Sequence, residues 1–322
     1  MIDPQLQQHL CEVLGVPEVT GLETIQTLWS GCGQVARVIL DDASPVVIKH
    51  VKMPERLRHP RGWDTDRSAQ RKVRSYEVET NWYAQRAGRC SAGCRVPRYL
   101  GHASRGDERL LILEDIDASG FDRRLTRVSP EQLDACIRWL ACFHATFLGE
   151  APDGLWETGT YWHLGTRPDE YDALPDGPLK HSAQQIDHAL DASPYQTLVH
   201  GDAKPANFCF SADNRVAAVD FQYVGGGCGM KDLAYLVGGC LDSDACFESE
   251  AHVLATYFAA LKQALHERGS AADTEQLESD WRRLYPYAWA DFERFLQGWS
   301  PGHWKISTYS RHMTEQVLES LR

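Results

Sequence analysis

The pattern of apolar and polar positions changes along the chain and predicts a β-rich first third. Residues 34–40 and 46–51 are rich in β-branched side chains and predict two neighbouring strands. The apolar run at 110–113 predicts a short buried strand. Between them, the spacing of apolar residues over 68–87 predicts a helix. A sheet with one helix is therefore expected in this part of the chain.

The rest of the chain is predicted to be mainly helical. Ser129 can cap a helix that begins at Pro130, and Gln132 completes a capping box. That helix is expected to run to about Phe147. Further helices are expected over 181–191, 230–240, 246–267 and 273–297. The order of elements predicts an α+β protein with an amino-terminal lobe at 1–113, a connector at 114–119 and a carboxy-terminal lobe at 120–322.

Composition narrows the class of protein. The net charge of −12 argues against a nucleic-acid surface and weakly favours a neutral or cationic substrate. No basic segment followed by an apolar one opens the chain, and the longest apolar run, 233–241, is about half a membrane span. The ten cysteines form no paired C-x-x-C ligand sets, so we expect reduced thiols in a cytoplasmic protein without a membrane span.

The segment around residue 200 carries the clearest chemistry. His200-Gly201-Asp202 is followed five residues later by Asn207, and a predicted hairpin from Phe208 onward leads to Asp220. Phosphoryl transfer needs one carboxylate beside the attacking hydroxyl and further oxygen ligands that hold Mg²⁺ against the phosphates. Asp202 is the candidate catalytic base, and Asn207 and Asp220 are the candidate metal ligands.

These residues resemble the catalytic core of the aminoglycoside phosphotransferase and choline kinase superfamily. The closest branch is the ecdysteroid-kinase-like (CHK-kinase-like) group, because the metal motif reads Asp220-Phe221-Gln222 rather than Asp-Phe-Gly. The resemblance implies a bilobal protein-kinase-like fold that uses ATP and Mg²⁺ and phosphorylates a hydroxyl group of a small molecule. It also implies that His200 and Asp232 support the catalytic loop without taking part in chemistry.

A lysine from the first lobe is expected to bind the phosphates. Lys49 ends an apolar strand and is preferred over Lys52, which follows three residues later. Its acidic partner should come from the predicted helix. Glu79 shares a helical face with Tyr76 and Tyr83, so it is preferred to Glu77.

Two further segments are candidates for nucleotide binding. Gly31 and Gly33 would let the backbone approach phosphates, although a plain turn is the alternative interpretation. Glu114 and Ile116, which follow the buried strand, resemble a connector that bonds adenine through backbone groups.

The acceptor pocket is sought in two stretches rich in aromatic residues, one around Trp156 to His163 and one around Trp299 to Lys305. Trp162, His163 and Trp304 are the candidate substrate contacts, with core packing as the alternative. Such residues would suit an amino alcohol, a sterol-like alcohol or an antibiotic.

Two other functions are considered. A kinase-like scaffold without activity is disfavoured because Lys49, Asp202, Asn207 and Asp220 are all present. A protein kinase is disfavoured because only about ten residues, four of them glycines, separate the metal motif from the next predicted helix, which leaves little chain for a peptide platform.

Overall fold

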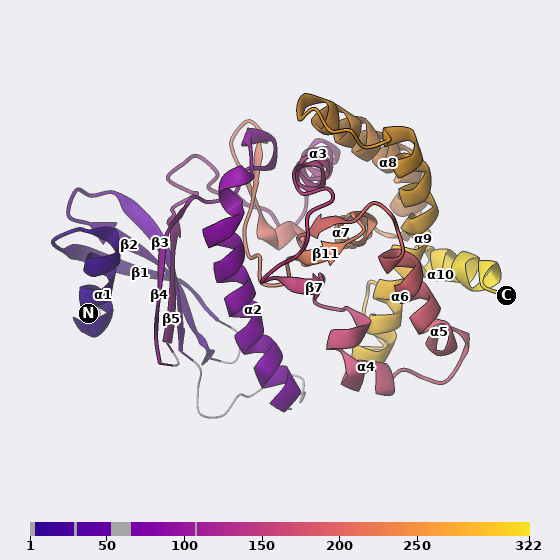
Figure 1. Cartoon of the computed structure of the whole chain (residues 1–322), viewed down its shortest axis with the longest axis horizontal. Helices are drawn as coiled ribbons and strands as arrows, with labels where there is room; N and C mark the ends of the chain where they lie inside the picture. Colours follow the sequence, from indigo (N-terminus) through magenta and orange to yellow (C-terminus); the bar gives the residue numbers. More distant parts are fainter. Residues whose placement is uncertain (1–3, 29–30, 53–65, 107) are drawn as a thin grey trace.

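The chain is α+β, as predicted, with a sheet at one end of its long axis and helices at the other (Figure 1). The computed structural model describes residues 4–28, 31–52, 66–106 and 108–322. The two termini lie at opposite ends of the molecule. Within the described residues, no helix is long and apolar enough to cross a membrane.

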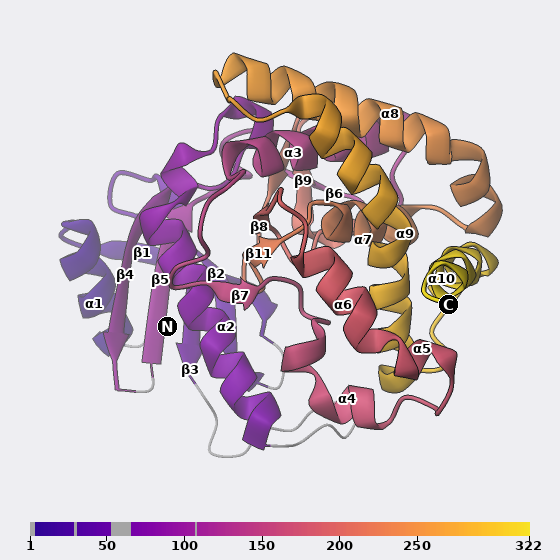
Figure 2. The same cartoon turned by 45° about the vertical axis from the view of Figure 1, so that its right-hand side comes forward.

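The amino-terminal part is built on a five-stranded antiparallel sheet in the order β1-β2-β3-β5-β4. Helix α1 (Pro4–Leu14) covers one face, and α2 (Asp66–Gln85) lies between the sheet and the carboxy-terminal helices in both views (Figures 1 and 2). The strands are β1 (Val19–Thr27), β2 (Gly33–Leu40), β3 (Pro45–Lys52), β4 (Tyr99–Arg105) and β5 (Glu108–Glu114). The prediction did not include α1, β1 or β4.

The alternation of side chains along β3 decides which residue reaches the active site. Ile48 is fully buried among the residues under α1, including Leu10. Because neighbouring residues of a strand point to opposite faces, Lys49 points to the other side of the sheet, where α2 lies. The alternation of side chains along β3 therefore directs Lys49 toward α2.

The carboxy-terminal part is mainly helical, and its core joins α3, α7, α8 and α9. Helix α3 begins with the predicted capping box: Ser129 Oγ accepts from the Gln132 backbone, and the Gln132 side chain accepts from the Ser129 backbone at 2.8 Å. The helices are α3 (Pro130–Thr146), α4 (Pro168–Asp172), α5 (Pro178–His181), α6 (Ala183–Asp191), α7 (Met230–Cys240), α8 (Ser243–Glu267), α9 (Thr274–Trp299) and α10 (Thr308–Ser320). Of these, α4, α5 and α10 were not predicted; the helix expected at 181–191 corresponds to α6.

Two small sheets support the loops between these helices. The predicted hairpin is present, since β9 (Phe208–Phe210) pairs antiparallel with β10 (Val216–Ala218), and β6 (Arg123–Arg124) adds a third strand. The other sheet has the order β7 (Trp156–Thr158), β11 (Gly225–Gly227) and β8 (Thr197–Val199).

Two of the three glycines of strand β11 have neighbours that leave no room for a side chain. A Cβ at Gly225 would lie 2.2 Å from the carbonyl oxygen of Trp156, and one at Gly226 would lie 2.6 Å from that of Glu157. The glycines therefore let the chain that follows Asp220 lie between two strands.

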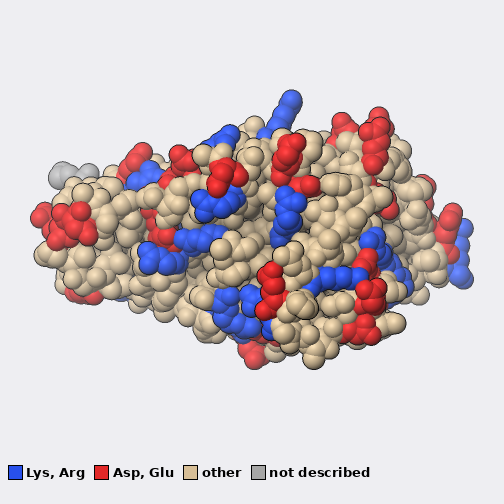
Figure 3. All heavy atoms as spheres, turned by 90° about the horizontal axis from the view of Figure 1, so that it is seen from above, with Lys and Arg blue, Asp and Glu red and all other residues tan. Residues whose placement is uncertain are grey.

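The surface carries both signs of charge. On the face shown in Figure 3, basic and acidic side chains of the described residues are interspersed. All ten cysteines are free thiols.

Candidate active site

The Asp202 carboxylate lies in the loop after β8 and is held by three donors. Tyr235 Oη donates to Oδ1 at 3.0 Å, while Lys204 Nζ and Asn207 Nδ2 donate to Oδ2 at 2.7 and 3.1 Å. The residue is 8% exposed. A carboxylate has room for about four hydrogen bonds, so Oδ1 can accept one more, from an incoming hydroxyl group.

Backbone contacts fix the loop that presents Asp202. The fully buried Asp232 carboxylate accepts from the backbone nitrogens of His200 and Gly201 at 2.5 and 2.9 Å. Gly201 has φ +80°, and a Cβ there would lie 2.1 Å from the carbonyl oxygen of Tyr223, so glycine is required. Asp232 makes the contacts expected of a residue that braces the loop.

His200 is also occupied by the backbone. Its Nδ1 accepts from the Asp202 backbone nitrogen at 3.2 Å, which leaves Nε2 as the donor to the Val219 carbonyl at 3.1 Å. With both ring nitrogens used, His200 has none free to act as a base.

Asn207 and Asp220 come to the same end of the β9–β10 hairpin. The backbone nitrogen of Val219, which precedes Asp220, donates to the Asn207 carbonyl at 3.0 Å. Asn207 Nδ2 is turned toward Asp202, and its Oδ1 accepts no hydrogen bond from any residue that the structure describes. Asp220 has φ +70° and a side chain that is 35% exposed. An amide oxygen and a charged carboxylate at the same end of a hairpin fit the ligand preference of Mg²⁺.

Lys49, on β3, connects α2 to the end of the hairpin at this point. Its Nζ donates to Glu79 Oε2 at 2.7 Å and to Asp220 Oδ1 at 3.1 Å. The two alternatives have other partners: Lys52 pairs with Glu108, and Glu77 pairs with Arg109, both at 2.6 Å. The predicted ion pair between Lys49 and Glu79 is therefore present.

The charges of this cluster stabilise one another. Burial would raise the pKa of Asp220, but the charges of Lys49, Lys204 and Lys72 outweigh burial and lower it. Burial would lower the pKa of Lys49, but Asp220 and Glu79 raise it instead. Burial also raises the pKa of Glu79, against the charge of Lys49. Asp220 and Lys49 are thus both charged at neutral pH.

The two residues after Asp220 attach the motif to α2. The Phe221 ring stacks on Trp82, and Gln222 Oε1 accepts from Lys72 Nζ at 2.9 Å. Helix α2 also carries Glu79, which binds Lys49, and Lys49 binds Asp220. Phe221 and Gln222 therefore contact α2 directly, and Asp220 is connected to it through Lys49.

Of the other residues predicted to contact the nucleotide, Gly33 and Glu114 have structural roles in this fold. Gly33 has φ +124°, and a Cβ there would lie 2.0 Å from the His50 carbonyl oxygen, so the close approach of β2 and β3 requires glycine. Gly31 has φ +71° with open space around it. The Glu114 carboxylate accepts from Arg95 and Ser119. These bonds outweigh burial and lower the pKa of Glu114 to about 2. The backbone of Glu114 and Ile116 as an adenine contact stays a prediction.

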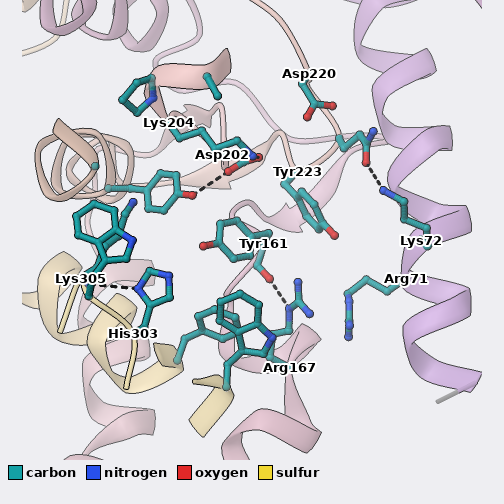
Figure 4. A pocket seen from close by; sticks show the side chains of 18 of the residues that line it. Arg71, Lys72, Tyr161, Arg167, Asp202, Lys204, Asp220, Tyr223, His303 and Lys305 are labelled. Atoms are coloured by element: carbon teal, nitrogen blue, oxygen red, sulfur yellow. Dashed lines mark hydrogen bonds and ion pairs between the residues drawn. The ribbon is translucent and has the colours of Figure 1, made fainter. Parts of the chain in front are cut away.

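A cavity of about 610 Å³ opens beside Asp202 and Asp220 (Figure 4). This volume suits a small molecule. Its wall combines aromatic and basic side chains, and Lys305 and Arg71 reach it from opposite sides. The wall includes Tyr161, Tyr223, Tyr235, Phe295, Trp299, His303 and Trp304, together with Arg71, Lys72, Arg167, Lys204 and Lys305.

Of the three predicted substrate contacts, only Trp304 lies on this wall; it is 66% exposed. Trp162 is fully buried and donates from Nε1 to Asp291 at 3.0 Å, so placing it in the cavity was wrong. His163 faces Asp187, with Nε2 and Oδ1 3.3 Å apart, and is also absent from the wall. The chain turns at Thr160, where φ is +90°, and Tyr161 is the residue that faces the cavity.

Three side chains at the site were given no role by the sequence analysis. Tyr235 could have been found because it follows Asp232 by three residues on one helical face. Lys204 stands two residues after Asp202 within the motif itself. Lys305 had no signal beyond its place beside Trp304.

The chain belongs to the phosphotransferase enzyme family, whose sequence model matches residues 24–287. This match confirms the predicted superfamily and enzyme class; the ecdysteroid-kinase-like branch stays a prediction. No curated protein sequence matches the chain significantly.

Three solved structures illustrate what the chain is similar to. A thermostable mutant of aminoglycoside phosphotransferase APH(4)-Ia, in complex with ADP and hygromycin B, has 14% identity and a TM-score of 0.48 over 98% of both chains. Choline kinase LicA from Streptococcus pneumoniae has 13% identity and a TM-score of 0.46 over 98% of this chain and 99% of its own. Macrolide 2'-phosphotransferase MphH from Brachybacterium faecium has 15% identity and a TM-score of 0.49 over 92% and 98%. The family assignment rests on the sequence match, because scores and identities this low carry no weight.

Proposed function

We propose that this phosphotransferase uses ATP and Mg²⁺ to phosphorylate a hydroxyl group of a small molecule. The observation that carries the proposal is the position of Lys49 Nζ between Glu79 and Asp220, at 2.7 and 3.1 Å. Burying a lysine costs desolvation energy that close contacts with carboxylates offset, and here one carboxylate comes from α2 and the other from the end of the hairpin.

Asp202 is positioned to receive the acceptor. Its Oδ2 is saturated by Lys204 and Asn207, so Oδ1, beside Tyr235, is the oxygen that can accept a bond from the acceptor hydroxyl and take its proton. The three donors keep the carboxylate in one orientation, and transfer depends mainly on such positioning.

The cations around Asp202 would stabilise the transferred group. Lys204 is held at the Asp202 carboxylate, and Asp202 raises the pKa of Lys204 against the effect of burial. A lysine that stays charged can offset the negative charge on the phosphoryl oxygens.

Asn207 Oδ1 and the Asp220 carboxylate would hold Mg²⁺. When bound, the ion supplies charge neutralisation at the nucleotide phosphates. The protein orients both groups: Asn207 Nδ2 donates to Asp202, which leaves Oδ1 for the ion, and Lys49 binds only Oδ1 of Asp220, which leaves its Oδ2.

The test is ATP consumption with a panel of amino alcohols, sugars, antibiotics, sterols and nucleosides, followed by mass spectrometry for a phosphate ester. We expect at least one phosphorylated alcohol with the wild-type protein and none with Asp202→Asn. Asp213→Asn is the matched control, because the Asp213 side chain is 64% exposed in the hairpin turn. Magnesium-dependent nucleotide binding without any product would contradict the proposal and favour an inactive scaffold.

A further inference from the structure

The wall of the acceptor cavity is basic although the chain is acidic. It contains five cationic side chains and two carboxylates, Asp202 and Asp220. Both carboxylates are already committed, Asp202 to Lys204 and Asp220 to Lys49. Each carboxylate is therefore already paired with a lysine, and the wall keeps a net positive charge.

Lys305 has no carboxylate within ion-pair distance of its Nζ among the described residues. Its Nζ instead lies 4.1, 5.5 and 5.6 Å from the ring centroids of Tyr235, Phe292 and Trp304. Burial lowers the pKa of Lys305 to about 8, an effect that Asp202 partly offsets. Such a lysine is still mostly charged at pH 7, with its ammonium directed at the cavity (Figure 4).

Arg71 and Arg167 form a second basic group across the cavity. Both lie near one buried carboxylate, Glu170, which accepts from Arg167 at 3.0 Å and lies 4.0 Å from Arg71. Burial lowers the pKa of Arg71, and the charge of Arg167 adds to this effect. Two guanidinium groups that share one carboxylate leave an excess of positive charge on this side.

A cationic acceptor would meet repulsion from both sides. An ammonium group next to Lys305 or Arg71 would face a like charge in a partly desolvated space, where Coulomb energies exceed those in water. An anionic group would instead gain charge-assisted hydrogen bonds.

The aromatic part of the wall fits a flat ring. Trp304 and His303 are nearly parallel, with planes 24° apart and centroids 5.8 Å apart, and Phe295 stacks on Trp299 at 5.4 Å. The exposed indole of Trp304 offers a face on which a ligand ring can lie.

We infer that the acceptor is a hydroxylated anion, in which a carboxylate or phosphate group carried on a flat ring system pairs with Lys305. The inference rests on the proposed function. The hydroxyl oxygen would bond to the γ-phosphorus of ATP while its proton passes to Asp202, and the bond from that phosphorus to the β-phosphate oxygen would break to release ADP. Lys305 would bind the acidic group of the acceptor while Asp202 receives its hydroxyl. Tyr235 lies between these two residues: its ring faces Lys305 Nζ, and its hydroxyl donates to Asp202.

The test uses four probes that differ in one substituent of a hydroxymethylbenzene ring. They are 3-(hydroxymethyl)benzoate, 3-(hydroxymethyl)phenyl phosphate, the neutral 3-(hydroxymethyl)benzamide and the cationic 3-(hydroxymethyl)benzylammonium. Binding is measured by quenching of tryptophan fluorescence, since Trp299 and Trp304 lie on the wall. We expect at least one of the two anions to bind tenfold or more tightly than the ammonium, and the stronger of the two identifies the acidic group.

Variants of Lys305 test the cause of this preference. Lys305→Met should reduce the preference for the anion by about tenfold, and Lys305→Arg should restore part of it. Lys262→Met is the matched control, because Lys262 lies on α8 and pairs with Glu275 and Glu278.

The inference fails if neither anion binds measurably, if the ammonium binds as tightly as the anions, or if Lys305→Met leaves the preference unchanged. Phosphorylation of a cationic alcohol would overturn the inference and leave the proposed function intact. Tight anion binding without ATP consumption by any alcohol would count against the proposed function alone.

Discussion

The Phe221 ring stacks on the indole of Trp82, with centroids 3.6 Å apart and planes 7° apart. Trp82 lies one helical turn beyond Glu79 on α2, whereas Phe221 follows directly on Asp220. The stack therefore fixes the distance between the helix that holds Glu79 and the hairpin end that holds Asp220. It stabilises the fold and positions Lys49 between its two carboxylates.

The first prediction concerns this stack. Trp82→Ala removes a fully buried ring and should lower the free energy of unfolding by about 3–5 kcal/mol. Phe247→Ala is the control, because Phe247 is 44% exposed and should change it far less. Denaturant unfolding followed by circular dichroism measures both. Equal losses in the two variants would show that the stack contributes nothing.

The second prediction compares the two lysines at the end of β3. Lys49→Ala should reduce kcat/KM for ATP on the order of a hundredfold, because it removes a fixed positive charge at the phosphates. Lys52→Ala should have little effect, since its side chain is 67% exposed and pairs with Glu108. Steady-state kinetics in ATP decide the matter, and a larger defect at Lys52 would show that the wrong lysine was chosen.

The third prediction separates the two active-site carboxylates by nucleotide binding. Asp220→Asn removes the charged metal ligand and should abolish the magnesium-dependent part of nucleotide affinity. Asp202→Asn should leave that affinity within a few-fold of wild type, while reducing turnover on the order of a thousandfold. Titration of a fluorescent ATP analogue with and without Mg²⁺ tests this. If Asp202→Asn lost magnesium dependence instead, the two roles would have to be exchanged.

The fourth prediction contrasts two tryptophans. Trp304→Ala should raise the KM of the acceptor and leave the free energy of unfolding within about 0.5 kcal/mol, because the side chain is mostly exposed. Trp162→Ala should lower the free energy of unfolding by about 3–5 kcal/mol, because it is fully buried and its Nε1 bond to Asp291 is lost. Unfolding curves and acceptor kinetics on both variants test this, and a stability loss at Trp304 would contradict its place on the cavity wall.

The fifth prediction is a pH dependence of stability. Burial lowers the pKa of Lys305 to about 8 in the folded chain, whereas an unfolded lysine has a pKa of about 10.4. Between these values the unfolded chain binds the additional proton, so the contribution of Lys305 to the free energy of unfolding rises with pH. Below pH 8 its buried charge is fully destabilising.

Lys305→Met should therefore unfold with on the order of 2 kcal/mol more free energy than wild type at pH 7. The difference should shrink toward pH 10, and urea unfolding at both pH values measures it. Lys262→Met, which breaks a surface ion pair, should not stabilise the protein. A constant difference between pH 7 and pH 10 would mean that Lys305 is not desolvated.

The parts of the site that lie on periodic elements could be predicted from the sequence. The alternation along β3 separates Lys49 from Ile48, and the helical period places Glu79 beside Tyr76 and Tyr83. The hairpin length brings Asn207 and Asp220 together. In each case the period of the backbone determines the direction of the side chain, so no tertiary information is needed.

The wall of the cavity beside Asp202 could not be predicted in this way, because it is built from loops and helix ends. Tyr161 and Trp162 are adjacent and both aromatic, yet one lines the cavity and the other is buried beside Asp291. The turn at Thr160 that separates them has no signal in its residue type. The basic character of the cavity could not be predicted either. The net charge of −12 describes the whole chain, and Arg71 and Lys305 come to the same cavity only in the folded protein.

Elements with few buried residues were also missed. Helix α1 buries only Leu6 and Leu10, and β1 buries only Val19 along its length. A pattern with so few apolar positions is too weak to identify an amphipathic element. By contrast, α3 has a capping box and many buried residues, and its start was predicted correctly.

The glycine strand β11 has a consequence for how the segment around Asp220 can move. The chain from Asp220 to the start of α7 at Met230 is held in a sheet by this strand. A Cβ at Gly225 or Gly226 would overlap the backbone of β7, so a larger residue in β11 would displace the segment that carries Asp220. We therefore expect this segment to keep one arrangement whether or not a substrate is bound.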